Sequence, residues 1–268
     1  MRFAYVIAGS EATGGAGLQA DLKTFQQLGV YGIGTITCIV SFDPKNGWAH
    51  RFRPVDPEII AEQFEAATAS QDLDTVKIGM LGTEATIDAV AAALRSQPWR
   101  HVVLDPVLIC KGQEAGAALN TDNALKAKVL PLATVVTPNN FEALALAGLD
   151  SLETVEDLAE AGRRILALGP QAAIVKGGID FPGPDAVDVL VQRGEEGAPP
   201  SVEVFSVPKI GQERVSGAGC TFASAVTAEL AKGSSVSDAV RTAKSFVTRA
   251  IASRVAGHTP FDTVWQGA

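Results

Sequence analysis

The chain has 268 residues, 47% of them hydrophobic and 19% charged, a composition typical of a globular protein that excludes a disordered or fibrous chain. It has 30 acidic and 22 basic side chains and a net charge of −8, so it lacks the basic excess of nucleic-acid-binding proteins. The three cysteines lie far apart, so we expect neither disulfides nor zinc clusters. The first apolar run is too short for a secretory signal, and no run reaches the ~18–20 apolar residues of a membrane span. We therefore expect a cytoplasmic protein without membrane contact.

Short runs rich in β-branched residues alternate with longer helical patterns along the whole chain, the order typical of a parallel α/β sheet. Most of these runs are apolar at every position, as strands covered on both faces are. The sequence therefore predicts an α/β fold with a mostly parallel central sheet and helices on both faces. No linker or repeat interrupts it, so residues 1–268 are expected to form one domain. The expected strands are residues 3–8, 33–40, 75–79, 101–105, 134–137, 172–176, 186–191 and 202–207.

Three helices carry clear start signals or a long apolar stripe. Asp56 followed by Pro57 is typical of an N-cap and a first helical residue. Thr154 with Asp157 three residues later resembles a capping box. Residues 236–255 show the 3.6-residue period over a length that covers much of a sheet.

Three segments depart from the alternation of strands and helices. Residues 43–52 contain Asn46-Gly47, a turn signal between strand-like flanks, and predict a projecting hairpin that acts as a small lid. Residues 179–185 and 194–201 are rich in proline and glycine and are expected to be strand connections. All three are equally consistent with surface loops.

The first of two glycine-rich passages follows the first expected strand. In it, Gly15-x-Gly17-x-x-Ala20 matches the dinucleotide-binding fingerprint formally. In that fingerprint the first glycine turns the chain directly off the strand, whereas Gly15 comes seven residues after Ala8. We therefore disfavour an NAD site here.

The second glycine-rich passage, residues 215–226, leads into a helix that runs to Lys232. The free N–H groups of Ala218, Gly219 and Cys220 would make an anion hole suited to a phosphate. A thiol at a helix N-terminus has its pKa lowered from ~8.5 toward neutrality, so we expect Cys220 to suit the role of a general base. The alternative is a tight helix start around a buried cysteine.

Polar residues close the next expected strands. Asp105 ends one strand, Asn139 and Glu142 follow another, and Lys176 ends a third, while no P-loop sequence occurs. Carboxylates at the carboxyl edge of a sheet suit Mg²⁺, and the lysine suits a phosphate. Each residue alone is equally consistent with a solvated strand end.

Seven segments, which together span nearly the whole chain, carry a resemblance when they are taken in order. The segments are residues 8–25, Val30-Tyr31-Gly32, Lys77-Ile78-Gly79-Met80-Leu81, Leu104-Asp105-Pro106-Val107, Thr137-Pro138-Asn139-x-x-Glu142-Ala143, Lys176-Gly177-Gly178 and Gly217-x-Gly219-Cys220-Thr221. They resemble the hydroxymethylpyrimidine kinase and pyridoxal kinase branch of the ribokinase superfamily. The resemblance implies a ribokinase-like fold and an ATP- and Mg²⁺-dependent transfer of the γ-phosphate to a hydroxymethyl group on an aromatic nitrogen heterocycle. It also suggests a homodimer.

The family's residue roles carry over where positions match. The resemblance implies that Cys220 is the catalytic base. Two departures are an Ala at 218, where Thr is commoner, and Ser216 in place of the usual His; the backbone donors survive both. The remaining implied roles are Gly217, Ala218 and Gly219 in the anion hole; Asp105 and Glu142 at the metal; Asn139, Glu142, Lys176 and Gly178 at the nucleotide; and Gly9, Ser10, Asp21, Phe42, His50, Val107 and Cys110 at the substrate.

Phe42 bears on the choice of substrate. Hydroxymethylpyrimidine kinases of this branch typically have a Gln there, which pairs with the aminopyrimidine edge, and a phenyl ring cannot make that pair. Residues 43–50 and 107–112 are similar to the bacillus-type pyridoxal kinases of the branch. We therefore expect pyridoxal, pyridoxine or pyridoxamine as substrate. Hydroxymethylpyrimidine or phosphomethylpyrimidine kinase of thiamine biosynthesis, or both activities, is the alternative, and a non-catalytic vitamer-binding protein is a further one.

Four residues, three of them at the expected substrate site, carry individual hypotheses. The Cys110 thiol could add reversibly to the aldehyde of pyridoxal, or it is an apolar cysteine that follows a strand. His50 and Trp48 on the expected hairpin could contact the ring, or they pack against each other. Cys38 lies inside an expected buried strand and is interpreted as structural.

Overall fold

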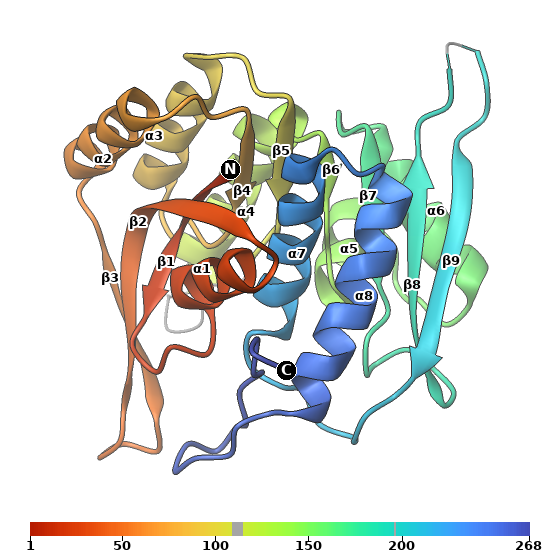
Figure 1. Ribbon diagram of the computed structural model, residues 1–268. Coiled ribbons are helices and arrows are strands. Elements are labelled where there is room, and N and C mark those ends of the chain that lie inside the picture. Colours follow the sequence, from red (N-terminus) through yellow and green to blue (C-terminus); the bar gives the residue numbers. More distant parts are fainter. Residues whose placement is uncertain (109–114, 196) are drawn as a thin grey trace.

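The computed structural model describes residues 1–108, 115–195 and 197–268, with the backbone alone for 115–119. Its strands form a nine-stranded sheet in the order β3-β2-β1-β4-β5-β6-β7-β8-β9 (Figure 1). The strands are β1 (Arg2–Glu11), β2 (Val30–Asp43), β3 (Ala49–Pro54), β4 (Thr75–Ile78), β5 (His101–Leu104), β6 (Val135–Val136), β7 (Ala172–Lys176), β8 (Asp185–Gln192) and β9 (Ser201–Pro208).

The sheet is mostly parallel, as predicted. The neighbours from β2 through β1, β4, β5 and β6 to β7 all pair in parallel. β3 pairs antiparallel with β2, and β8 and β9 complete the other edge in antiparallel pairs. Because the central strands run the same way, their carboxyl ends share one edge of the sheet, where ligand sites of open α/β sheets form.

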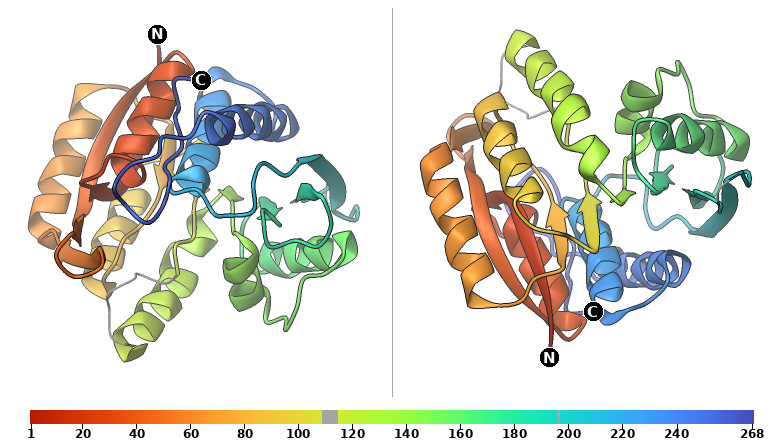
Figure 2. Two further views of the ribbon diagram at one scale, coloured as in Figure 1. Left: turned by 90° about the horizontal axis from the view of Figure 1, so that it is seen from below. Right: turned by 90° about the horizontal axis from the view of Figure 1, so that it is seen from above.

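Helices cover both faces of the sheet (Figure 2). The side chains of β1 alternate between them: Tyr5 and Ile7 pack in the core beneath α2 to α6, whereas Ala4 and Val6 pack toward α1 and α7. The larger core lies under α2 to α6, and a second core lies between the sheet and α7 and α8. The helices are α1 (Gly17–Gln27), α2 (Pro57–Ser70), α3 (Glu84–Arg95), α4 (Ala115–Lys128), α5 (Asn140–Ala147), α6 (Val155–Leu166), α7 (Ala218–Lys232) and α8 (Val236–Ala252), with a short 3₁₀ helix at Leu130–Leu132.

The helix start signals in the sequence act as predicted. The Asp56 side chain accepts a hydrogen bond from the Glu58 amide at the start of α2. Thr154 and Asp157 form a reciprocal capping box at the start of α6. The last helix is shorter than expected and ends at Ala252, because Val255 pairs with Thr263 in the C-terminal segment instead.

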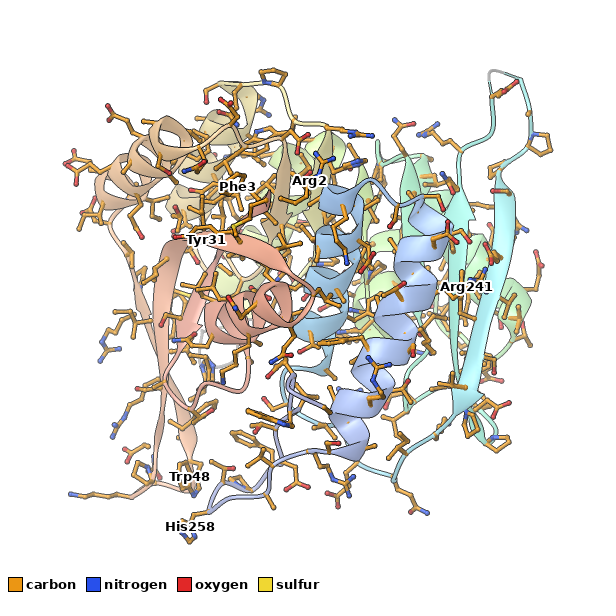
Figure 3. All side chains as sticks on the ribbon, viewed as in Figure 1. Arg2, Phe3, Tyr31, Trp48, Arg241 and His258 are labelled. Atoms are coloured by element: carbon orange, nitrogen blue, oxygen red, sulfur yellow. The ribbon has the colours of Figure 1, made fainter. Side chains whose placement is uncertain are left out.

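β2 and β3 form the projecting hairpin that the turn signal predicted. Its tip includes Trp48, which has a positive φ of 60°, and in Figure 3 Trp48 and His258 lie at the same end of the molecule. The hairpin contacts the C-terminal segment, since the Phe42 and Phe261 ring centroids are 5.2 Å apart. The C-terminal segment therefore lies beside the hairpin at the edge where the parallel strands end.

None of the helices in the described part of the chain is both long enough and apolar enough to cross a membrane.

Candidate active site

Polar residues at the carboxyl ends of β5, β6 and β7 meet at one edge of the sheet. The Lys176 ammonium lies 3.4 Å from Oδ1 of Asp105, and the Thr137 hydroxyl donates to the same oxygen at 3.4 Å. Asp105 is 4% exposed and Lys176 is also largely buried, so this ion pair is shielded from bulk water. The parallel topology thus brings together residues from separate strands.

Glu142 adds a second buried carboxylate at this edge. It forms a capping box with Asn139 at the start of α5, in which the Asn139 amide donates to Glu142 at 2.8 Å. Burial raises the pKa of Glu142 to about 8, repulsion from Asp105 adds to the rise, and Lys176 opposes it. The capping role was not predicted, although Asn followed three residues later by Glu is a sequence signal for it.

The first turn of α7 faces the same polar group. A Cβ built on Gly219 would lie 3.6 Å from the Lys176 ammonium and 4.0 Å from an Asp105 oxygen. The expectation of a free Ala218 amide is wrong, because that amide donates to the Val215 carbonyl at 3.4 Å. The amides of Gly219 and Cys220, in the first turn of the helix, remain as donors for an anion.

Cys220 joins the second glycine-rich passage to the first. Its side chain is partly exposed to a cavity, and the Gly17 amide donates a hydrogen bond to the thiol. Burial raises the pKa of the Cys220 thiol to about 11, which the Lys77 ammonium opposes. The prediction of a lowered pKa is therefore wrong, because the helix start lies inside the protein and near the carboxylates of Asp21 and Asp105.

A carboxylate that the sequence analysis missed holds the first glycine-rich passage. Glu11, at the end of β1, accepts hydrogen bonds from the Thr13 amide at 2.6 Å and hydroxyl at 2.7 Å. It also accepts from the amides of Gly15 at 3.2 Å and Ala16 at 3.3 Å. One side chain thus fixes the loop that leads to Gly17.

The C-terminal segment packs against the second glycine-rich passage, which no sequence signal predicted. The Ser216 amide donates to the Asp262 carbonyl at 2.9 Å, and the Val264 amide donates to the Ser216 carbonyl at 3.1 Å. Further along, the Gln266 side chain donates to the Thr221 hydroxyl at 3.0 Å in a buried position. The segment thus closes one side of the site.

A cavity of about 540 Å³ lies between the strand ends, the start of α7 and α8. Charged residues line one part, including Asp188 and Lys244, which form a buried ion pair at 2.7 Å. Val207, Val247 and Ile251 line an apolar part. The residues of the sequence analysis that line it are Asp105, Val107, Asn139, Glu142, Lys176, Gly178, Gly217, Ala218, Gly219 and Cys220.

The other predicted site residues do not line this cavity. Gly9 is buried at the end of β1, and Ser10 accepts a hydrogen bond from the Gln19 side chain at 2.8 Å. Phe42 packs edge-on against His50, with ring centroids 5.4 Å apart. Asp21 is wholly buried, so in this structure it reaches neither the cavity nor solvent. Cys110 lies outside the described residues.

The carboxylates at this edge of the sheet could hold a magnesium ion only if a bound ligand completed its coordination shell. Among residues 1–108, 115–195 and 197–268, no group of three or more His, Cys, Asp or Glu side chains is close enough to hold a metal ion. Mg²⁺ usually takes one or two carboxylates and completes its shell with water and substrate phosphates. Asp105 and Glu142 suit this role, since a cation between them would relieve the repulsion that raises the pKa of Glu142.

Comparisons of the sequence identify similar proteins along nearly its full length. Residues 11–262 match the family model described as phosphomethylpyrimidine kinase. The pyridoxine kinase of Bacillus subtilis is 45% identical over 251 residues, which cover 94% of this chain and 90% of that protein. The hydroxymethylpyrimidine/phosphomethylpyrimidine kinase of Haemophilus influenzae is 37% identical over 248 residues, which cover 91% of this chain and 89% of that protein.

Solved structures agree with these matches. The ADP complex of Bacillus subtilis pyridoxal kinase superimposes with a TM-score of 0.92 and 42% identity, covering 100% of this chain and 98% of that one. The Staphylococcus aureus pyridoxal kinase in complex with AMP-PCP and pyridoxal superimposes with a TM-score of 0.90 and 36% identity, covering 100% of this chain and 94% of that one. Both likenesses extend over the whole sheet and its helices.

Proposed function

The chain belongs to the phosphomethylpyrimidine kinase family, and from that premise we propose that it is a pyridoxal kinase, which transfers the γ-phosphate of ATP to the 5′-hydroxymethyl group of pyridoxal, pyridoxine or pyridoxamine. The observation that carries the proposal is the position of Cys220. Its thiol lies at the N-terminus of α7, on a cavity that also holds Lys176 and Asp105, and it contacts the first glycine-rich passage. A base beside an anion hole is what phosphoryl transfer to an alcohol needs.

The cavity suits a nucleotide. Its apolar part, lined by Val207, Val247 and Ile251, can pack against a flat base, while Lys176 and the start of α7 suit the phosphates. The kinases in the two similar structures were solved with ADP and with AMP-PCP, which supports ATP as the phosphate donor. Asp105 and Glu142 are the residues that would hold a magnesium ion, which would neutralise phosphate charge.

The chemical step uses Cys220 as the base. Its deprotonated sulfur accepts the proton of the 5′-hydroxyl group, and the oxygen attacks the γ-phosphorus in line. The bond between that phosphorus and the bridging oxygen breaks, and ADP leaves. Lys176 and the amides of Gly219 and Cys220 hold the negative charge on the transferred group.

Pyridoxal is favoured over hydroxymethylpyrimidine for two reasons. The pyridoxine kinase relative is 45% identical and the hydroxymethylpyrimidine kinase relative 37%, so the chain is nearer to the former. Phe42 packs with the rings of His50 and Phe261. This aromatic group stands where a Gln would hydrogen-bond to the aminopyrimidine edge of the other substrate. Hydroxymethylpyrimidine or phosphomethylpyrimidine phosphorylation stays as the second candidate, since the matched family is described as phosphomethylpyrimidine kinase and the Haemophilus influenzae relative is a hydroxymethylpyrimidine/phosphomethylpyrimidine kinase.

ADP release measured with pyridoxal, pyridoxine and hydroxymethylpyrimidine tests the proposal. We expect turnover with the two B6 vitamers and a kcat/KM at least about ten-fold lower with hydroxymethylpyrimidine. The reverse preference would establish a hydroxymethylpyrimidine kinase. No turnover with any of the three alcohols would favour a non-catalytic vitamer-binding protein. A melting temperature raised by NAD and not by ATP would instead support the dinucleotide reading.

The remaining parts of the proposal concern assembly and location. We propose that residues 1–268 act as a single domain, since one sheet spans the chain from β1 to β9. A homodimer and a cytoplasmic location follow from the family resemblance and from the need for ATP. Size-exclusion chromatography with light scattering would test the dimer.

A further inference from the structure

Two charged side chains that the proposed reaction leaves unused lie wholly buried beside α7. Lys77 of β4 and Asp21 of α1 are both 0% exposed. The Lys77 ammonium lies 3.0 Å from each oxygen of Asp21, and the Ser224 hydroxyl donates to Oδ1 at 2.6 Å. A buried ion pair contributes little net stability, because removing both charges from water offsets their attraction.

The pair lies one helical turn from the catalytic thiol. Helices α1 and α7 contact each other through two hydrogen bonds, from the Gly17 amide to Cys220 and from Ser224 to Asp21. Asp21 follows Gly17 by four residues, and Ser224 follows Cys220 by four, so the two contacts lie on matching faces of both helices. This arrangement places Asp21, and with it the Lys77 ammonium, beside the first turns of α7 that carry the proposed base.

The site has room for an ammonium group because its neighbours are small. A Cβ built on Gly79 would lie 2.9 Å from the Lys77 ammonium and 3.0 Å from the Ala8 side chain. Any side chain at residue 79 would therefore push Lys77 away. The buried position of Lys77 therefore explains why residue 79 is a glycine.

The charges that face Cys220 come from several elements. Lys77 of β4 opposes the burial that raises the pKa of the thiol, whereas Asp21 of α1 and Asp105 after β5 raise it further. Lys176 of β7 lies near the same turn, beside Gly219. Burial lowers the pKa of Lys77, but Asp21, Cys220 and Asp105 together raise it above its usual value, so Lys77 keeps its charge.

We propose that Lys77 is a positioning residue whose ammonium, held by Asp21 and Ser224, stabilises the deprotonated sulfur of Cys220 from behind. Asp21 then serves the reaction by orienting Lys77 and not by contacting the substrate. The inference rests on the proposed role of Cys220 as the base. In this proposal the site uses two cations, Lys77 for the deprotonated sulfur and Lys176 for the phosphate.

The main test measures the reactivity of Cys220 without substrate. Lys77→Met alone would leave a buried, unpaired carboxylate, so the variant is Lys77→Met with Asp21→Asn. Because Lys77 lowers the pKa of Cys220 by more than Asp21 raises it, iodoacetamide labelling of the Cys220 peptide, followed by mass spectrometry from about pH 7 to 10, should be about two- to five-fold slower at pH 9 than in the wild type. Asp88→Asn with Lys128→Met removes an exposed ion pair at 2.5 Å and should leave the labelling rate unchanged.

Kinetics separate this role from a merely structural one. The double variant should have its pH profile of kcat displaced to higher pH, so that kcat is lower than in the wild type by a similar factor at every pH from about 7 to 10, with both KM values nearly unchanged. Ser224→Ala, which removes no charge, should slow labelling by roughly three-fold and provides the test if the double variant does not fold. Wild-type labelling rates and an unchanged pH profile in a folded variant would overturn the proposal.

The two proposals fail in different ways. If the wild type phosphorylates none of the three alcohols, the proposed function fails, whereas labelling still reports whether Lys77 acts on the Cys220 sulfur. If the wild type is active and the variants label normally, the inference about Lys77 alone is wrong.

Discussion

The carbonyl oxygen of Gly15 occupies the place that a Cβ of residue 217 would need, so the two glycine-rich passages touch through their backbones. Gly217 also has a φ of +80°, a conformation that residues with side chains rarely adopt. This contact sets the start of α7 against the loop that Glu11 holds. The start of α7, the Cys220 thiol and the first glycine-rich passage therefore form one unit.

Gly217→Ala should disrupt this unit. The positive φ alone costs about 1–3 kcal/mol for a residue with a Cβ, and the overlap with Gly15 adds to it. We expect a lower melting temperature and a large loss of kcat. Gly29→Ala is the matched control, because Gly29 has a φ of +73° but nothing within 4 Å of a built Cβ. Equal losses in the two variants would show that the Gly15 contact is unimportant.

The pH dependence of catalysis should follow the Cys220 thiol. Its pKa of about 11 in the free protein means that the sulfur is protonated at neutral pH, and a base must be deprotonated to act. We therefore expect kcat/KM to rise between about pH 7 and 10, by close to ten-fold per pH unit. Cys220→Ala should abolish this rise, lower kcat by roughly 10²–10⁴ and leave ATP affinity nearly unchanged. A flat profile in the wild type would contradict Cys220 as the base.

Glu142→Gln should stabilise the protein at alkaline pH. The folded-state pKa of Glu142 is about 8, above the 4.5 of an ordinary glutamate, so ionising it costs stability as pH rises through that interval. We expect the variant to melt at nearly the wild-type temperature near pH 5 and several degrees higher near pH 9. It should nevertheless lose activity if Glu142 holds magnesium. A variant that is less stable at both pH values would show that the capping contact with Asn139 outweighs the burial of charge.

Phe42→Gln should change the substrate preference. The substitution removes an aromatic ring that packs on His50 and Phe261 and introduces an amide able to pair with an aminopyrimidine. We expect kcat/KM to fall by about ten-fold for pyridoxal and to rise for hydroxymethylpyrimidine. Tyr31→Gln, a change to an exposed aromatic residue far from the hairpin tip in Figure 3, should alter neither value. If both substrates respond equally, Phe42 has no part in choosing between them.

Much of the fold could be predicted because its signals are local. The sequence predicts the strand at 172–176 with its observed bounds, and the Asp56 and Thr154 caps begin helices where expected. These features depend on a few neighbouring residues, whose apolar period and capping groups are visible in the sequence. The end of α8 was misplaced because a distant partner, Thr263, pairs with Val255.

The sequence by itself determined the α/β order of elements, the hairpin and the residue types available for phosphate chemistry. Only the tertiary structure decided that Asp21 is buried against Lys77 and that the pKa of Cys220 is raised instead of lowered. The physical reason is that burial and electrostatic interaction are summed over α1, β4, β5 and α7, which lie far apart in the chain. A helix N-terminus can be recognised in a sequence, but the protein that surrounds it exists only once the chain has folded.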